Sequence, residues 1–176
     1  MCIRDSLYAH GEDGMECFKV NNQLDTQARG VYLITVTPFS RQKSTMRSVL
    51  ARVAGRVPVV VGASSPGFAP MRELTQSVMD LGAAGVMVAP PSTVRSDDQI
   101  TAYFDMVNET LGADVPWVLQ DHPVATGVQM STGVILRILK NSPRCVMLKH
   151  EDCPGLAKLS AIRAAGDKGD LKRVSI

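Results

Sequence analysis

One lysine ends an apolar run and could act as a nucleophile. Lys149 follows the residues CVML, so the aliphatic part of its side chain starts in an apolar strand and its ammonium lies at the strand end. An ordinary lysine pKa of about 10.4 leaves well under ~0.1% neutral amine at pH 7. Desolvation or a nearby cation that lowers such a pKa to about 7–8 lets the amine attack a carbonyl and form a Schiff base. The alternative is a structural lysine that reaches solvent or pairs with Glu151 or Asp152.

A second group of polar residues follows two neighbouring apolar runs. It comprises Asp121, His122, His150, Glu151 and Asp152. Imidazoles and carboxylates of this kind can bind a divalent metal. The proline after His122 and the absence of HxH or HExxH spacing favour capping roles in loops, so we predict no metal site and no cofactor.

Small polar residues follow the other apolar runs. The ASSPG stretch at 63–67 could bind a carboxylate or phosphate through backbone N–H groups, although such stretches are more often plain turns. These loops supply the candidate substrate-binding residues, which are Thr37, Ser64, Ser92, Thr93, Thr126 and Gly127.

The elements that must position these residues repeat along the chain. Short apolar runs recur at intervals of 26 to 31 residues, the length of one strand, one helix and two loops. Helical stripes fill the gaps, with Ser96 and Ser131 as expected starts and Gly82 and Gly112 as expected ends. The runs begin at Val31, Val57, Ala84, Val115, Cys145 and Arg173, and the stripes cover 46–53, 71–81, 100–111, 134–139 and 156–162.

The expected fold class is α/β. The strands are apolar throughout, so both of their faces must be covered, which favours parallel strands under helices. A closed barrel and a doubly wound sheet both fit, but no GxGxxG follows the first strand, and this favours the barrel. A full eight-fold barrel takes ~250 residues. We therefore predict an incomplete (β/α)8 barrel over residues 30–176, with active-site residues at the carboxyl ends of its strands.

Composition excludes several classes of protein. A hydrophobic content of 45% argues against wholesale disorder, and a net charge of +2 is too small to favour a nucleic-acid partner. No apolar run approaches the ~18–20 residues of a membrane helix. The four cysteines show no CxxC or framework spacing, so we expect a reducing, cytoplasmic compartment.

The first 29 residues differ from the rest. They are polar, lack periodicity, and contain Gly11, Gly14, Asn21 and Asn22, which break helices and strands. We expect a disordered leader, or an artefactual one, since the opening MCIRDS resembles the translation of a transposon-end adapter used in sequencing libraries.

Five segments carry a family resemblance. They occur in family order at family-like spacing, and together they resemble the dihydrodipicolinate synthase / N-acetylneuraminate lyase family over residues 30–176. That resemblance implies an eight-fold barrel, usually a homotetramer, that performs Schiff-base aldol chemistry on 2-oxo acids with Lys149 as the imine-forming lysine. The segments are GVYLITVTPF (30–39), RVPVVVG (56–62), GAAGVMVAPP (82–91), LQDHPVATG (119–127) and VMLKHEDCPG (146–155).

The chain also departs from the family pattern. The family's carboxylate-binding Gly-Thr-Thr-Gly-Glu loop is absent, which implies that one strand-helix unit is missing between Phe39 and Ser44. The resemblance also implies that the family's seventh and eighth units would follow residue 176. We therefore expect this chain alone to be inactive.

Other departures fall on the expected catalytic residues. Gln120 stands where the family has its proton-relaying tyrosine, and an amide cannot act as an acid or base near neutral pH. Ala125 replaces an arginine, and Ser92 and Thr93 replace paired tyrosines. We therefore expect an aldolase, lyase or dehydratase branch in which Asp121 or His122 transfers the proton.

Two rival functions stay open at this point. One is a metal-dependent barrel lyase that uses Asp121, His122 and Glu151. The other is a non-catalytic remnant of a barrel enzyme whose open strand edges stick to other copies.

Overall fold

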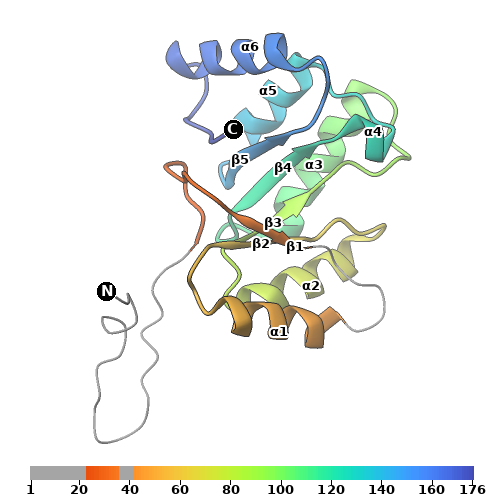
Figure 1. Cartoon of the computed structure of the whole chain (residues 1–176). Coiled ribbons are helices and arrows are strands. Elements are labelled where there is room, and N and C mark those ends of the chain that lie inside the picture. Colours follow the sequence, from red (N-terminus) through yellow and green to blue (C-terminus); the bar gives the residue numbers. More distant parts are fainter. Residues whose placement is uncertain (1–22, 36–41) are drawn as a thin grey trace, which may run out of the picture.

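A single parallel sheet organises the chain. The computed structural model describes residues 23–35 and 42–176, and within them the strands lie side by side in chain order (Figure 1). All neighbouring pairs are parallel, as the apolar runs predicted. The strands are β1 (Leu33–Thr35), β2 (Val59–Gly62), β3 (Gly85–Val88), β4 (Trp117–Asp121) and β5 (Cys145–His150).

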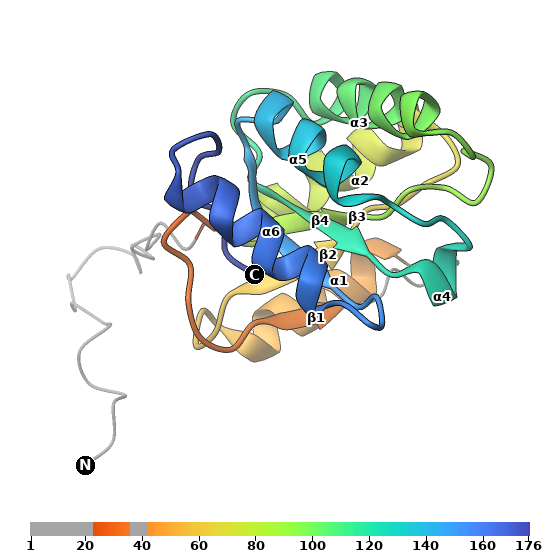
Figure 2. The same cartoon turned by 90° about the horizontal axis from the view of Figure 1, so that it is seen from above.

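Helices alternate with the strands and follow the outer side of the curved sheet (Figures 1 and 2). This is the arrangement of an incomplete (β/α)8 barrel, so the predicted fold class is confirmed. The short α4 was not predicted, because four residues carry no periodicity. The helices are α1 (Gln42–Val53), α2 (Phe68–Asp80), α3 (Asp97–Leu111), α4 (Pro123–Thr126), α5 (Thr132–Asn141) and α6 (Leu156–Asp167).

Side-chain caps set the start of two helices. The Ser96 hydroxyl accepts from the Gln99 N–H at 3.2 Å, and the Gln99 side chain accepts in return from the Ser96 N–H, which forms a capping box before α3. Ser131 accepts from the Val134 N–H at 3.2 Å and begins α5. Both starts were predicted from the sequence.

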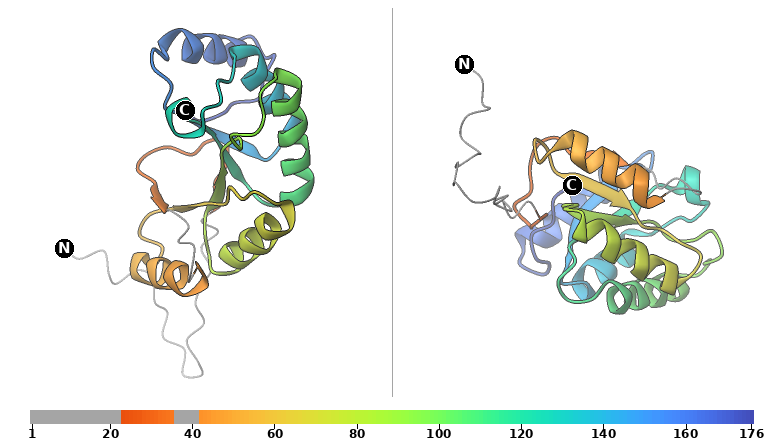
Figure 3. Two further views of the ribbon diagram at one scale, coloured as in Figure 1. Left: turned by 90° about the vertical axis from the view of Figure 1, so that its right-hand side faces the viewer. Right: turned by 90° about the horizontal axis from the view of Figure 1, so that it is seen from below.

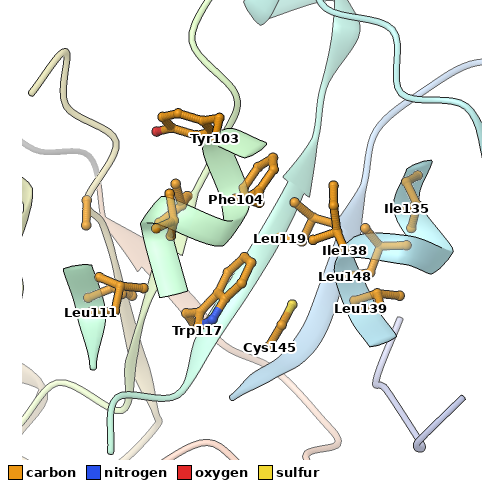
Figure 4. Packing of buried hydrophobic residues seen from close by; sticks show 14 of the residues in the cluster. Tyr103, Phe104, Leu111, Trp117, Leu119, Ile135, Ile138, Leu139, Cys145 and Leu148 are labelled. Atoms are coloured by element: carbon orange, nitrogen blue, oxygen red, sulfur yellow. The ribbon is translucent and has the colours of Figure 1, made fainter. Parts of the chain in front are cut away.

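The main hydrophobic core lies between the sheet and the helices. Trp117 of β4 is 1% exposed and stacks on Phe104 of α3, with ring centroids 5.8 Å apart (Figure 4). Leu119 and Leu148 point into the same layer and meet Ile138 of α5. This packing fixes the helix-covered face of β4 and β5, and so determines which side chains face the other way.

A smaller apolar cluster covers the opposite, inner face of the sheet. Strand residues such as Val60, Val118 and Val146 meet Leu24, whose N–H donates to the Ala84 carbonyl at 2.8 Å. Leu24 and Ala28 thus pack on the inner face of the sheet. The rest of the expected leader, residues 1–22, lies outside the described residues.

The last apolar run begins to pair with β5. Ser175 forms a parallel bridge with Met147, and its hydroxyl donates to the Ala28 carbonyl at 2.7 Å. A cleft of about 770 Å³ lies between this C-terminal segment, α6 and residues 28–30, and it contains none of the site residues predicted from the sequence. The side view in Figure 3 shows the sheet with its helices and the C-terminus. Within the described residues, no helix is both long and apolar enough to cross a membrane.

We predict that Gly85→Ala destabilises the sheet. A Cβ there would lie 2.7 Å from the Pro116 carbonyl oxygen and 3.0 Å from Leu24, so backbone must move, at a cost of about 1–3 kcal/mol in the free energy of unfolding. Gly133→Ala is the matched control, since its Cβ would meet only Ser131 at 3.8 Å and should be neutral or stabilising by up to about 1 kcal/mol. Urea unfolding measures both, and equal stability of the two variants would contradict this close approach.

Candidate active site

The predicted nucleophile lies at the carboxyl end of β5, beside Gln120. The two residues are direct partners in the β4–β5 ladder, and a register shift between Trp117 and Val118 produces this pairing. Because side chains alternate along a strand, Gln120 and Lys149 share the inner face with Val118 and Met147. The sequence-predicted neighbours are therefore brought together on the open face of the sheet.

One carboxylate joins these two side chains. The Lys149 Nζ lies 2.7 Å from Oε2 of Glu151, and the Gln120 Nε2 donates to the same oxygen at 2.9 Å. The Glu151 N–H donates to the Asp121 carbonyl at 2.8 Å, which extends the β4–β5 ladder past the strand end. The Lys149 and Glu151 side chains are each 31% exposed, so a small molecule can reach the pair.

The surroundings keep Glu151 ionised. Burial raises the pKa of its carboxyl, but hydrogen bonds from Gln120 and Lys149 outweigh this and bring the pKa below its ordinary value. The charges of Lys149 and His122 act in the same direction. His122 therefore lies close enough to influence the pair, and its buried Nδ1 has no hydrogen-bond partner among the described residues.

A different network occupies the helix-covered side of the same strand ends. The Asp121 side chain is fully buried, and its Oδ2 accepts from Nδ1 of His150 at 2.9 Å and from Nζ of Lys158 at 3.1 Å. Lys158 also contacts Asp152 at 2.7 Å. Asp121 is thus separated from Lys149 by the thickness of the sheet, which is a correction to its expected role in proton transfer at the lysine.

Lys158 holds this buried network together. Burial lowers the pKa of its ammonium, but contacts with Asp152 and Asp121 outweigh burial and raise that pKa. The hydrogen bond from Lys158 is the main cause of a lowered pKa at Asp152. Gly155 leaves room for the imidazole of His150, since a Cβ there would lie 2.2 Å from Nε2.

The other predicted binding residues serve mainly in turns. The Ser64 hydroxyl accepts from the Ala89 N–H at 2.9 Å and so ties two loops together. The Thr126 hydroxyl donates to the His122 carbonyl at 3.1 Å, and Gly127 ends α4 at φ 68°. Ser92 and Thr93 are exposed in the loop after β3, and Thr37 lies outside the described residues.

The metal-dependent alternative required Asp121, His122 and Glu151 to share a site. The structure instead places the carboxylates of Asp121 and Glu151 on opposite faces. Within residues 23–35 and 42–176, no three His, Cys, Asp or Glu side chains are placed to hold a metal ion. The Asp121 carboxylate is neutralised by Lys158 instead.

Sequence reasoning missed two partners. Glu151 was considered only as a metal ligand or as one of two possible ion-pair partners of Lys149, and Lys158 was not considered at all. Lys158 lies in the first turn of α6, where the helix dipole disfavours a cation. A lysine in that position is a signal that carboxylates lie nearby.

Comparisons with known proteins agree on one family. A model of the dihydrodipicolinate synthetase family matches residues 35–164. The 4-hydroxy-tetrahydrodipicolinate synthase of Thermus thermophilus is 33% identical over 113 residues, which cover 64% of this chain and 38% of that protein. The chain thus spans well under two thirds of the length of this curated relative.

Solved structures of the same family have the same fold. Dihydrodipicolinate synthase from Rhodopseudomonas palustris superposes with a TM-score of 0.75 at 37% identity, covering 88% of this chain and 64% of that one. YagE, a prophage protein of the dihydrodipicolinic acid synthase family from E. coli K12, was solved with pyruvate. It superposes with a TM-score of 0.61 at 22% identity, covering 73% and 43% of the two chains.

We predict strong coupling between Asp121 and Lys158. Lys158→Met leaves a buried carboxylate without its cation and should cost about 3 kcal/mol in the free energy of unfolding. Adding Asp121→Asn removes the uncompensated buried charge. The free energy of unfolding of the double variant should therefore fall by less than the sum of the decreases in the two single variants. Lys140→Met, on the exposed side of α5, should change stability by less than about 1 kcal/mol. Urea unfolding tests this, and simple additivity would contradict the network.

We also predict that Asp152 makes stability depend on pH. Its folded pKa is lowered, so its contribution is present above the ordinary value of about 4 and is lost as pH falls through the lowered value. Lys158 has a raised folded pKa, so its contribution is lost only as pH rises through that raised value. In thermal unfolding from pH 7 down to pH 3, the stability of Asp152→Asn should fall less than the stability of the unaltered chain. An identical loss would contradict this assignment.

Proposed function

The chain belongs to the dihydrodipicolinate synthetase family, and on this premise we propose that it is part of a lyase or synthase that forms a Schiff base with 2-oxo acids such as pyruvate. The whole protein would make or break the C–C bond next to the imine. The observation that carries the proposal is the position of Lys149 on the inner face at the carboxyl end of β5, where Glu151 and Gln120 converge.

The proposed chemistry needs a lysine at this place. The amine of Lys149 condenses with the 2-oxo group, and the protonated imine then withdraws electrons from the adjacent C–C bond. The carboxyl ends of barrel strands are where such chemistry is located, because their loops surround the substrate. YagE binds pyruvate on the same fold, which supports a small 2-oxo acid as substrate.

The neighbours of Lys149 have separate proposed roles. Gln120 donates a hydrogen bond and so orients the carboxylate beside the amine. His122 is the proton-transfer candidate that lies near the pair, whereas Asp121 acts from the far face by fixing His150, the residue after the nucleophile. Thr126 and Gly127 shape the loop that carries His122.

We further propose that this chain alone does not complete turnover. The family's carboxylate-binding loop has no counterpart in the sequence between Phe39 and Ser44, so a 2-oxo acid would be held mainly through the imine. The homotetramer of the whole protein, its cytoplasmic location and the absence of a nucleic-acid partner stay predictions from the sequence.

We predict selective trapping of pyruvate on Lys149. Incubation with pyruvate and borohydride, followed by peptide mapping, should label Lys149 at least about tenfold faster than the exposed Lys140 and Lys168 in the same sample, since groups that can transfer protons lie beside Lys149. Lys149→Arg should abolish that label and leave the others unchanged. Labelling of Lys149 at the rate of the exposed lysines would contradict the proposed function.

A further inference from the structure

We propose that Glu151 is the catalytic base and acid of imine formation, in the place of the missing phenol. This inference rests on the proposed function and adds a residue that touches the reacting nitrogen. Glu151 would accept the proton of the Lys149 ammonium and later deliver it to the departing hydroxyl.

The geometry satisfies the first requirement of a proton acceptor. The Glu151 Oε2 lies 2.7 Å from the Lys149 Nζ, within the range for direct transfer. Its backbone is fixed by the hydrogen bond to the Asp121 carbonyl, and Gln120 fixes its carboxylate. The base is therefore held by two residues of β4.

The second oxygen of the carboxylate is available to substrate. Both donors use Oε2, and Oε1 has no hydrogen bond from any described residue. At 31% exposure the side chain is accessible from the open face. One oxygen can thus take the lysine proton while the other faces a bound carbinolamine.

The protonation state also suits the role. Hydrogen bonds from Gln120 and Lys149 keep Glu151 ionised, so the group starts as a carboxylate whose oxygen can accept the lysine proton. Gln120 cannot exchange a proton near neutral pH, so among these three converging side chains Glu151 is the group that can do so.

The proposed steps balance. The Lys149 ammonium gives one proton to Glu151, and the neutral amine adds to the carbonyl carbon while the carbonyl oxygen becomes the carbinolamine hydroxyl by taking the second proton of the adding nitrogen. Glu151 then protonates that hydroxyl, the C–O bond breaks, water leaves, and the nitrogen lone pair forms the C=N bond. The products are a protonated imine, one water and the regenerated carboxylate, and no oxidant or reductant is consumed.

A carboxylate beside an ammonium has two opposed effects, and these separate catalysis from structure. Its hydrogen bond occupies the Lys149 nitrogen, so its removal should not slow attack on a reagent that needs no proton transfer. It also supplies the proton transfers of imine formation, so its removal should slow the reaction with pyruvate. A residue that merely held the lysine in place would affect both reactions in the same direction.

The experiment compares the unaltered chain with Glu151→Gln, Glu151→Asp and the control Glu109→Gln on the exposed side of α3. Two initial rates at Lys149 are measured by peptide mapping at pH 7: borohydride trapping of pyruvate, and acylation by acetic anhydride. For Glu151→Gln we expect trapping to fall about 100-fold and acylation not to fall. Glu151→Asp should recover part of the trapping rate, and Glu109→Gln should change neither.

Each other outcome has a defined meaning. A fall of both rates in Glu151→Gln overturns the proposal, because it shows that Glu151 only positions the lysine. An unchanged trapping rate also overturns it. If Lys149 of the unaltered chain is acylated but borohydride traps no pyruvate adduct on it, the proposed function itself fails. This outcome differs from the two above because it is seen in the unaltered chain and not in Glu151→Gln.

Discussion

A register shift of one residue between β4 and β5 determines which side chains meet at the site. Trp117 pairs with Cys145, but the next pair is Val118 with Met147, so Val146 is the extra residue. An unshifted ladder would place Lys149 opposite Asp121 rather than opposite Gln120. Such irregularities often occur beside active sites, where they redirect a side chain. The meeting of lysine, amide and carboxylate depends on this shift.

The same register places one polar group of side chains on each face of the strand ends. On the inner face, Lys149 is paired with a partly exposed carboxylate, an arrangement that contributes little to stability because solvent screens it. On the helix-covered face, Asp121 is fully buried and must be compensated by Lys158. The inner group is accessible to small molecules, while the buried group holds the two strand ends together.

Much of the scaffold was predictable, since it follows from local patterns. Five of the six apolar runs became strands because runs without alternation need two covered faces, and Ser96 and Ser131 begin helices because their hydroxyls satisfy free N–H groups. The lysine at the end of β5 was also identified. The faces on which the side chains of Asp121 and Glu151 lie were not predicted. A register shift leaves no pattern in the sequence of either strand, and it moves every later pairing by one residue.

If Gln120 stands where the family has a tyrosine, as the resemblance implies, the neighbouring carboxylate offers a physical reason for the amide. A phenol with an ordinary pKa near 10 holds its proton at neutral pH, so it serves as a donor or relay. The carboxyl of Glu151, with a lowered pKa, starts as an acceptor and reaches the nitrogen directly. An amide at position 120 fits such a base better than a phenol, because Nε2 can only donate and therefore holds the carboxylate without competing for the proton. Under the proposed function, Gln120 and Glu151 are thus two parts of one arrangement.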